Sequence, residues 1–293
     1  MSARNDVRQS GYIMIIMVVL MTAGAVAYFS QGVSNAKRDG ESRLQQNALN
    51  DLRTAKNKLL QFAQFQPEFY QSDNLSNTRI YKDLDKIPAP GYLPCPDADG
   101  NGWLEGGETT CSNPYDTADA TTGFVGGHLP IGIEGRNAYF GSIKPGDIHY
   151  FVDERFVNSN DQYNNPATSR FAPLNPGLTD LASNNHLPSL SLNGQAGYVV
   201  ILVHPGKNQA LDSANADTNA SFFTPSQSNN VNDDLVIGIR FNEWQTAVMQ
   251  RICAQKSRLE AIDSSQNVWT NAYDSSDNPA GSNWQAYLGN CAS

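Results

Sequence analysis

The stretch that decides the fold is Tyr12-Ile13-Met14-Ile15-Ile16-Met17-Val18-Val19-Leu20, which opens an apolar run extending to Phe29. No charged residue lies between Arg8 and Lys37. At about 1.5 Å rise per residue, roughly 20 apolar residues in a helix cross the ~30 Å hydrocarbon core of a bilayer. The run therefore predicts a membrane-spanning helix over residues 12–29. The basic residues before it predict, by the positive-inside rule, that the chain following the span lies outside the cytoplasm.

A second helical pattern follows the apolar run. Apolar residues recur at steps of three and four, which is one stripe of an α-helix; they are Leu44, Ala48, Leu52, Ala55, Leu59 and Phe62. Pro67 ends the pattern, because proline cannot continue a helix. The two patterns together predict one long helix over residues 12–66, with a membrane-spanning half and an amphipathic half. The alternative is a secretory signal peptide cut after Ala25-Val26-Ala27, which has no need of such a continuation.

The residues around the start of the run resemble a known family. Arg8-Gln9-Ser10-Gly11, followed by the apolar run from Tyr12, resembles the class III leader and mature start of type IV pilins and pseudopilins. By this resemblance, residues 1–11 are a leader peptide that a prepilin peptidase removes between Gly11 and Tyr12. Tyr12 then becomes a methylated N-terminus, and the helix over 12–66 joins the core of a filament.

One position departs from the usual pattern of that family. Ile16 occupies the fifth place of the expected mature chain, where most members carry a Glu that pairs with the N-terminus of a neighbouring subunit. No acidic residue lies between Asp6 and Asp39. This departure is similar to the K-type pseudopilin and its pilus counterparts, minor subunits with no subunit above them. The resemblance therefore implies a minor subunit at the filament tip.

The four cysteines all follow the predicted span, which agrees with export to an oxidising compartment. Three pairings are open, and the sequence-local one, Cys95 with Cys111 and Cys253 with Cys291, is favoured here. The rival interpretation is a zinc site. It is disfavoured because no C-x-x-C pair occurs and the histidines are scattered without ligand spacing; these are His128, His149, His186 and His204.

A metal motif lies between the first two cysteines, at residues 97–108. The sequence Asp97-Ala98-Asp99-Gly100-Asn101-Gly102-Trp103-Leu104-Glu105-Gly106-Gly107-Glu108 matches the twelve-residue calcium loop D-x-[DN]-x-[DN]-G-x5-E at each specified position. Ca²⁺ takes about six to eight oxygen ligands, and alternating carboxylates on a tight loop supply them. The predicted ligands are Asp97, Asp99, Asn101, the Trp103 carbonyl, Glu105 directly or through water, and Glu108 with both oxygens.

The flanks of this motif are not those of an EF-hand. Pro90, Pro94 and Pro96 exclude an entering helix, because each removes a backbone donor and restricts the residue before it. The sequence therefore predicts a calcium-stabilised loop without flanking helices. An acidic surface turn without a metal stays open as the alternative.

The remainder reads as an α+β domain over residues 67–293, loop-rich and built on an antiparallel sheet. Apolar runs bounded by turn signals predict strands at 148–152, 198–203 and 234–239. The polar segment 207–232 predicts a long exposed loop, and the spacing from Phe241 to Ile262 predicts a helix. The tryptophans are expected to be core residues.

The composition and the motifs argue against two classes of function. The net charge of −9 argues against a nucleic-acid partner, which needs clustered basic residues. No nucleotide, hydrolase or metalloprotease motif occurs, so an enzyme is not expected.

The resemblance instead implies a minor pilin or pseudopilin, of a pilus or a type II secretion pseudopilus, that initiates assembly or presents a calcium-stabilised domain for adhesion. Its expected partners are other pilins or pseudopilins, the prepilin peptidase, the bacterial inner membrane and a surface or cargo ligand at the tip. The expected location is a single pass through the inner membrane with a periplasmic domain, then the pilus or cell surface. The alternative is a secreted or membrane-anchored calcium-dependent binding protein outside any filament.

Overall fold

The structure is a computed structural model of the chain, and two compact units divide it: Met1–Leu49 and Asn50–Ser293. The residues that it describes are 6–69, 90–104, 123–133, 139–140, 147–157, 174, 188–216, 219–225, 233–254, 256–257 and 291.

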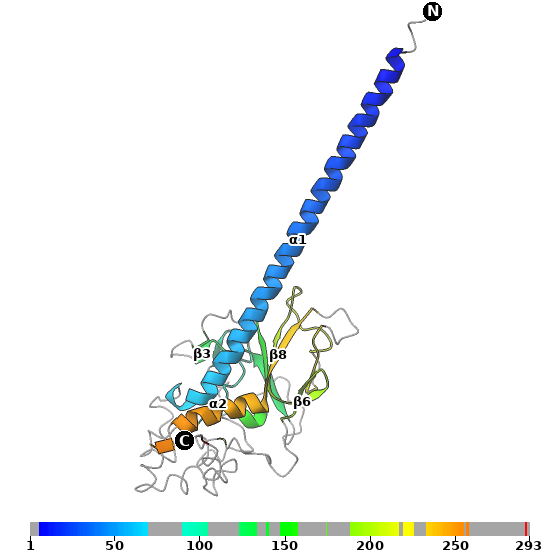
Figure 1. Cartoon of the computed structure of the whole chain (residues 1–293). Coiled ribbons are helices and arrows are strands. Elements are labelled where there is room, and N and C mark those ends of the chain that lie inside the picture. The colour runs from blue at the N-terminus through cyan, green and yellow to red at the C-terminus, as the bar shows by residue number, and fades with distance from the viewer. Residues whose placement is uncertain are drawn as a thin grey trace, which may run out of the picture. The chain divides into compact units, whose positions relative to one another are not determined.

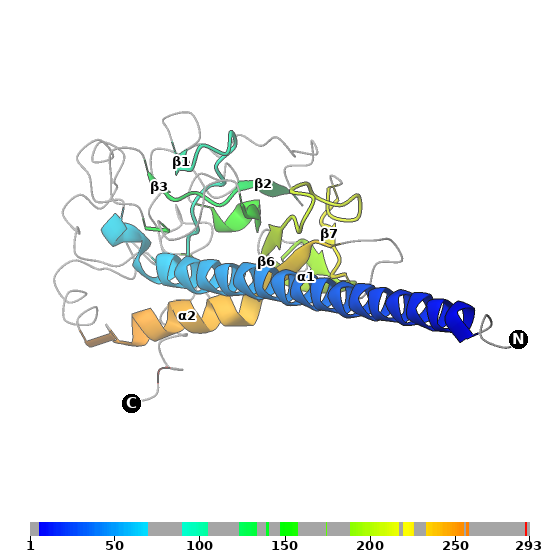
Figure 2. The same ribbon diagram turned by 90° about the horizontal axis from the view of Figure 1, so that it is seen from above.

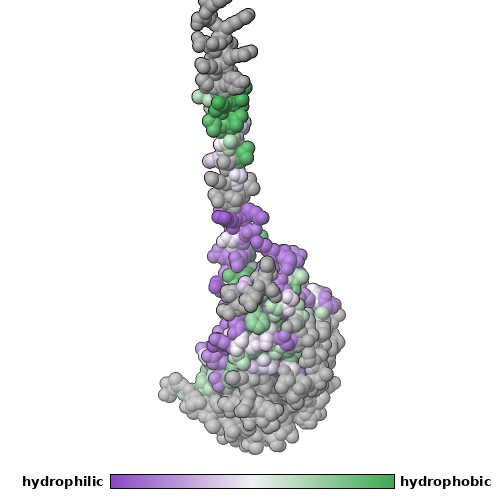
Figure 3. All heavy atoms as spheres, turned by 90° about the vertical axis from the view of Figure 1, so that its right-hand side faces the viewer, coloured by the Kyte–Doolittle hydropathy of each residue, from purple (hydrophilic) through white to green (hydrophobic). Residues whose placement is uncertain are grey.

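The first element is the helix α1, Asp6–Phe69, drawn from blue to cyan in Figure 1. Phe65 departs from helical geometry, with φ −117° and ψ 15°, so the helix is kinked near its C-terminal end. In the first unit, α1 carries a block of exposed apolar side chains, among them Met14, Ile15 and Leu20. This block appears in green along the helix in Figure 3.

The structure contradicts the expectation that one half of this helix spans a membrane. Among the described residues, no helix is long and apolar enough to cross a membrane. A span needs roughly 20 predominantly apolar residues within one helix. The prediction of a transmembrane segment at 12–29, and with it the single-pass location in the inner membrane, is therefore wrong.

The centre of the second unit is a six-stranded sheet with the order β2-β4-β6-β5-β7, in which β8 also pairs with β6. Its strands are β2 (Phe124–His128), β4 (His149–Asp153), β5 (Leu190–Leu192), β6 (Gln195–His204), β7 (Ser221–Phe222) and β8 (Leu235–Arg240). A separate two-stranded sheet joins β1 (Trp103–Leu104) to β3 (Gly132–Ile133).

The prediction of an antiparallel sheet is also wrong, because the six-stranded sheet is mixed. The pairs β2·β4, β4·β6, β5·β6 and β6·β8 are antiparallel, whereas β5·β7 and β1·β3 are parallel. The three apolar runs do form β4, β6 and β8, so those strand predictions are confirmed. The predicted helix after them begins at the expected residue, as α2 (Phe241–Ala254).

A tight turn joins β5 to β6. Asn193 and Gly194 both have positive φ, 52° and 74°, and Leu192 pairs with Gln195 across them. This is the two-residue hairpin connection for which Asn-Gly is the strongest sequence signal. The turn brings β5 against the first residues of β6, and Tyr198 of β6 pairs with both Leu190 of β5 and Arg240 of β8.

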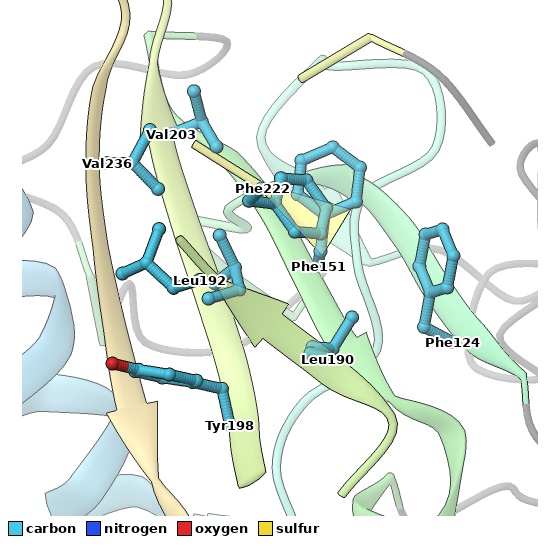
Figure 4. Close-up of a cluster of buried hydrophobic side chains, with 9 residues drawn as sticks. Phe124, Phe151, Leu190, Leu192, Tyr198, Val203, Phe222 and Val236 are labelled. Carbon is cyan, nitrogen blue, oxygen red and sulfur yellow. The ribbon is translucent and has the colours of Figure 1, made fainter. Parts of the chain in front are cut away.

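One face of the sheet carries an apolar cluster, shown in Figure 4. Strand alternation places Phe151, Ile201 and Val203 on the same face, where the Phe222 ring from β7 packs 4.7 Å from the Phe151 ring. The buried members are Phe124, Phe151, Leu190, Leu192, Tyr198, Ile201, Val203, Phe222 and Val236.

A second part of the core involves the helices. Leu52, Ala55 and Leu59 of α1 are completely buried, and Phe62 stacks on Phe140 with ring centroids 6.2 Å apart. Lys56 links the two helices, because its Nζ donates to Glu243 Oε1 of α2 at 2.7 Å and to the Gly238 carbonyl at 2.9 Å. Figures 1 and 2 both draw α2 alongside this part of α1.

The polar segment 207–232 differs from the expected exposed loop. It contains β7, and Asn215 is completely buried, accepting a hydrogen bond from the Phe223 N–H at 2.8 Å. Its side-chain amide also donates to the Phe223 carbonyl, so one asparagine bonds both backbone polar groups of Phe223. A buried polar side chain can thus order a segment that has no apolar pattern.

Candidate metal centre

The predicted calcium loop is organised around Asp97. Its side chain is completely buried, and its two oxygens accept hydrogen bonds from the N–H groups of Gly100 at 2.8 Å and Gly102 at 2.6 Å. The first residue of the motif therefore has a fixed orientation in the folded chain.

The next residues of the loop form a series of short turns. The Asp99 carboxylate accepts from the Asn101 N–H at 3.0 Å, and the Asn101 side-chain oxygen accepts from the Trp103 N–H at 2.8 Å. Gly102 has φ +97°, a conformation that residues with a Cβ rarely adopt, so the motif's glycine is required here. Successive side-chain oxygens thus gather on a short segment, as a cation site needs.

The described part of the loop fits the oxygen chemistry of calcium, with carboxylates from Asp97 and Asp99 and an amide oxygen from Asn101. Trp103, whose carbonyl is a predicted ligand, lies in strand β1 of the two-stranded sheet. Glu105 and Glu108, the predicted closing ligands, lie outside the described residues. The geometry of a complete calcium shell is consequently a prediction, and the carboxylate cluster itself does not select calcium over other hard cations.

The loop is fastened to the main sheet at β2. Asp97 and His128 exchange two backbone hydrogen bonds, of 2.9 and 2.7 Å. Gly127 permits this approach, because a Cβ there would lie 2.5 Å from the Asp97 carbonyl oxygen. The preceding segment is held as well, since the buried Tyr150 hydroxyl donates to the Pro94 carbonyl at 3.0 Å.

The cysteines lie at two places in the second unit. Cys95, two residues before the loop, is buried and disulfide-bonded. Cys111 lies outside the described residues. Cys253 at the end of α2 is bonded to Cys291, which is the sequence-local pairing favoured above. The processing residues Gly11 and Tyr12 lie within α1, and the structure does not describe their side chains.

Three of the four histidines, judged scattered from their spacing, lie at one end of the sheet. His128 ends β2 and pairs directly with His149, which begins β4, and their ring centroids are 4.5 Å apart. His204 ends β6, next to Val203, the partner of His149. Burial lowers the pKa of His149 to about 4, and repulsion from His128 and His204 contributes to the same direction. Their positions at the ends of strands, and not their spacing along the chain, are the sequence feature that indicates this proximity.

A group of three acidic residues lies beside the same end of β6 and was not predicted from the sequence. One carboxylate oxygen from each of Asp212, Asp233 and Asp234 lies within 4.8 Å of the others. Asp234 is completely buried, and its Oδ2 accepts from the Asp212 N–H and from the Asn215 amide, both at 3.0 Å. Burial raises the pKa of Asp234 above its usual range, while those hydrogen bonds oppose the shift. The adjacent pair Asp233-Asp234 before an apolar run was the only available signal.

No family model, curated protein or solved structure matches this chain. The resemblance to type IV pilins thus rests on the short N-terminal motif alone.

Proposed function

We propose that the chain is a minor subunit of a type IV filament, a minor pilin or pseudopilin at the filament tip. The observation that carries the proposal is the exposed apolar block of α1. Met14, Met17 and Met21 are 58 to 72% exposed, and Ile15, Ile16, Val18, Val19, Leu20 and Val26 are exposed to a similar degree. Contiguous exposed apolar surface of this kind marks an interaction site, because its transfer out of water is favourable.

A helix from another subunit is the partner that suits this block. The apolar side chains occupy all sides of the helix rather than one stripe, which is typical of a helix enclosed by neighbours. The space around Gly24 is open, with nothing within 4 Å of an added Cβ, so a second helix can approach closely there. Thr22 does not interfere, since its hydroxyl donates back to the Val18 and Val19 carbonyls.

The absence of an acid in this block supports the tip assignment. A Glu at position 16 would serve to neutralise the N-terminus of a neighbouring subunit, and Ile16 cannot do so. A subunit that lacks this side chain is suited to the one position with no neighbour to neutralise. The second unit, with its own core and a loop of calcium-loop pattern, then forms the part presented at the tip.

The decisive experiment reads the mature N-terminus and the filament together. The chain is expressed in a bacterium with a type IV filament system, and the mass of its N-terminal peptide is measured in purified filaments. We expect a methylated Tyr12 and a copy number far below that of the major subunit. A mature start near Tyr28, with the protein released, would support the secreted calcium-dependent binding protein instead.

A matched pair of variants at the predicted cut isolates processing. Gly11→Ala is expected to retain partial processing, whereas Gly11→Leu is expected to block it, because the larger side chain occupies the residue before the cleaved bond. Filament-associated Gly11→Leu protein that had still lost its first residues would overturn the proposal. Regular spacing of the wild-type chain along filament shafts would overturn the tip position.

A further inference from the structure

We propose that His128 and His149 form a binding site for a divalent transition metal, of the copper or zinc kind, distinct from the calcium loop. The two residues are direct cross-strand partners in the β2·β4 ladder. Side chains at directly opposite positions of an antiparallel pair have Cβ atoms about 4.5–5.5 Å apart and lie on the same face. The two imidazole rings therefore lie side by side on one face of the sheet, with their centroids 4.5 Å apart. This proposal does not depend on the filament function.

The environment of the two rings favours a metal over a hydrogen-bonded pair. The Nδ1 atoms of His128 and His149 are buried, and neither has a hydrogen-bond partner among the residues that the structure describes. A buried polar atom without a partner is destabilising, and a metal that takes its lone pair removes that cost. Neutral imidazole is the nitrogen ligand preferred by copper, zinc and nickel, whereas calcium prefers oxygen.

The rings are also held in place. Their centroids are 4.5 Å apart with an interplanar angle of 39°, so they are near each other without being stacked flat. On its other side the His128 ring meets the calcium loop, since a Cβ on Gly100 would lie 3.1 Å from His128 Cδ2. The backbone of His128 is fixed by its two hydrogen bonds to Asp97. A pre-positioned pair needs little reorganisation to bind an ion.

His204 provides a stringent comparison. Its Nδ1 is also buried and has no partner among the described residues. It follows Val203, which pairs with His149, so the alternation of a strand places His204 on the opposite face. A site made by the cross-strand pair excludes His204 as a ligand, although it is a close neighbour.

The test is titration of the metal-free full chain with Cu²⁺, followed by electron paramagnetic resonance and calorimetry in the presence of millimolar Ca²⁺. We expect one Cu²⁺ per chain, with hyperfine coupling from two nitrogens that Ca²⁺ does not abolish. His128→Gln and His149→Gln are each expected to weaken binding by at least about tenfold, since losing even an indirect supporting group costs about 10–100-fold. Zn²⁺ should compete for the same site.

The controls are three variants that leave the pair intact: His204→Gln, His186→Gln and Asp233→Asn. The first removes the neighbouring histidine, the second the remaining histidine of the chain, and the third a carboxylate of the acidic group. All three are expected to bind Cu²⁺ as the wild type does. A copper spectrum with oxygen ligands only, or equal losses in His128→Gln and His204→Gln, would overturn the assignment. If His149→Gln does not fold, as judged by circular dichroism, the comparison of His128→Gln with His204→Gln decides.

Discussion

At the scale of single residues, His149 makes the chain sensitive to acid. Its folded-state pKa lies near 4, mainly because burial disfavours the charged ring, against an ordinary value of 6.5 in the unfolded chain. Between these values the unfolded chain binds the proton and the folded chain does not. The free energy of unfolding therefore falls as the pH drops from about 6.5 to about 4, by at most ~3 kcal/mol for this group. Above that window the contribution is complete.

This pH dependence can be assigned by difference. The free energy of unfolding is measured in urea between pH 4 and pH 7 for the wild type and for His149→Gln. Carboxylates also titrate in the lower part of this range, but they do so equally in both proteins. We expect the wild type to lose more stability than the variant on acidification. Parallel curves would show that His149 is protonated in the folded chain as readily as in the unfolded one.

Asp234 is expected to behave in the opposite way. Its raised pKa means that the folded chain binds its proton more readily than the unfolded chain, so its charge is a cost at neutral pH. In metal-free buffer, Asp234→Asn should therefore match or exceed the wild type in melting temperature, because the amide oxygen still accepts from the Asp212 N–H. Asp212→Ala is the control that removes a carboxylate bonded to the Asp233 N–H. If Asp234→Asn instead melts several degrees lower without metal, the ionised carboxylate stabilises the fold.

At the scale of elements, residues of α1 lie in two different environments, and a matched pair of substitutions tests both. Leu59 is completely buried, whereas Leu44 on the same helix is 66% exposed. Leu59→Ala is expected to lower the free energy of unfolding by about 2–5 kcal/mol, through lost burial and the cavity left behind. Leu44→Ala is expected to change it by no more than about 0.5 kcal/mol. Urea unfolding of the two variants measures the difference, and equal losses would contradict the burial of the helix stripe.

The elements that could be predicted are those whose own residues carry the signal. The strands β4, β6 and β8 are continuous apolar runs between turns, and α2 follows its helical spacing. The short strands β1, β3 and β7 have two residues each, so no pattern can develop in them. Their parallel pairings depend on distant segments, which explains why a purely antiparallel sheet was predicted. The β5–β6 hairpin was missed although Asn193-Gly194 signals it.

The same distinction separates the candidate sites. The predicted calcium loop is a local motif, so spacing alone is enough to propose Asp97, Asp99 and Asn101 as ligands. The cross-strand histidines are 21 residues apart in sequence and meet only through the β2·β4 register. The apolar run at the N-terminus was interpreted correctly as helical but wrongly as a membrane span. Periodicity predicts the conformation of a segment, whereas its environment depends on what surrounds it.

At the scale of the whole molecule, the two units place different demands on their surroundings. The second unit has its own core, a disulfide at the end of α2 and a loop anchored to the sheet. The first contains the N-terminal part of helix α1 and exposes the apolar block that the filament proposal places among other helices. A bound ion at residues 97–108 would act on the second unit alone. Its effect should therefore appear in the unfolding of the core, not in assembly through α1.

Calcium provides the test of that separation. Binding to the folded state alone stabilises by RT ln(1 + [L]/Kd), and extracellular calcium modules commonly have a Kd of about 0.1–1 mM. At about 10 mM Ca²⁺ the expected stabilisation is ~1.4–2.7 kcal/mol, a rise of several degrees in melting temperature for a domain of this size. Mg²⁺ should have little effect, because it requires a smaller octahedral shell and gives up water reluctantly.

Two substitutions of the same kind assign the effect to one of the two acidic groups. Asp99→Asn removes an exposed carboxylate from the predicted calcium loop and leaves the buried Asp97 in place, so it should greatly reduce the response to Ca²⁺. Asp233→Asn makes the same change in the group with Asp212 and Asp234, and its response should equal that of the wild type. The measurement is a thermal melt of each full chain with chelator, Ca²⁺ and Mg²⁺. Loss of the response only in Asp233→Asn would move the calcium site to the end of β6, and a wild type indifferent to Ca²⁺ would leave residues 97–108 as an acidic turn.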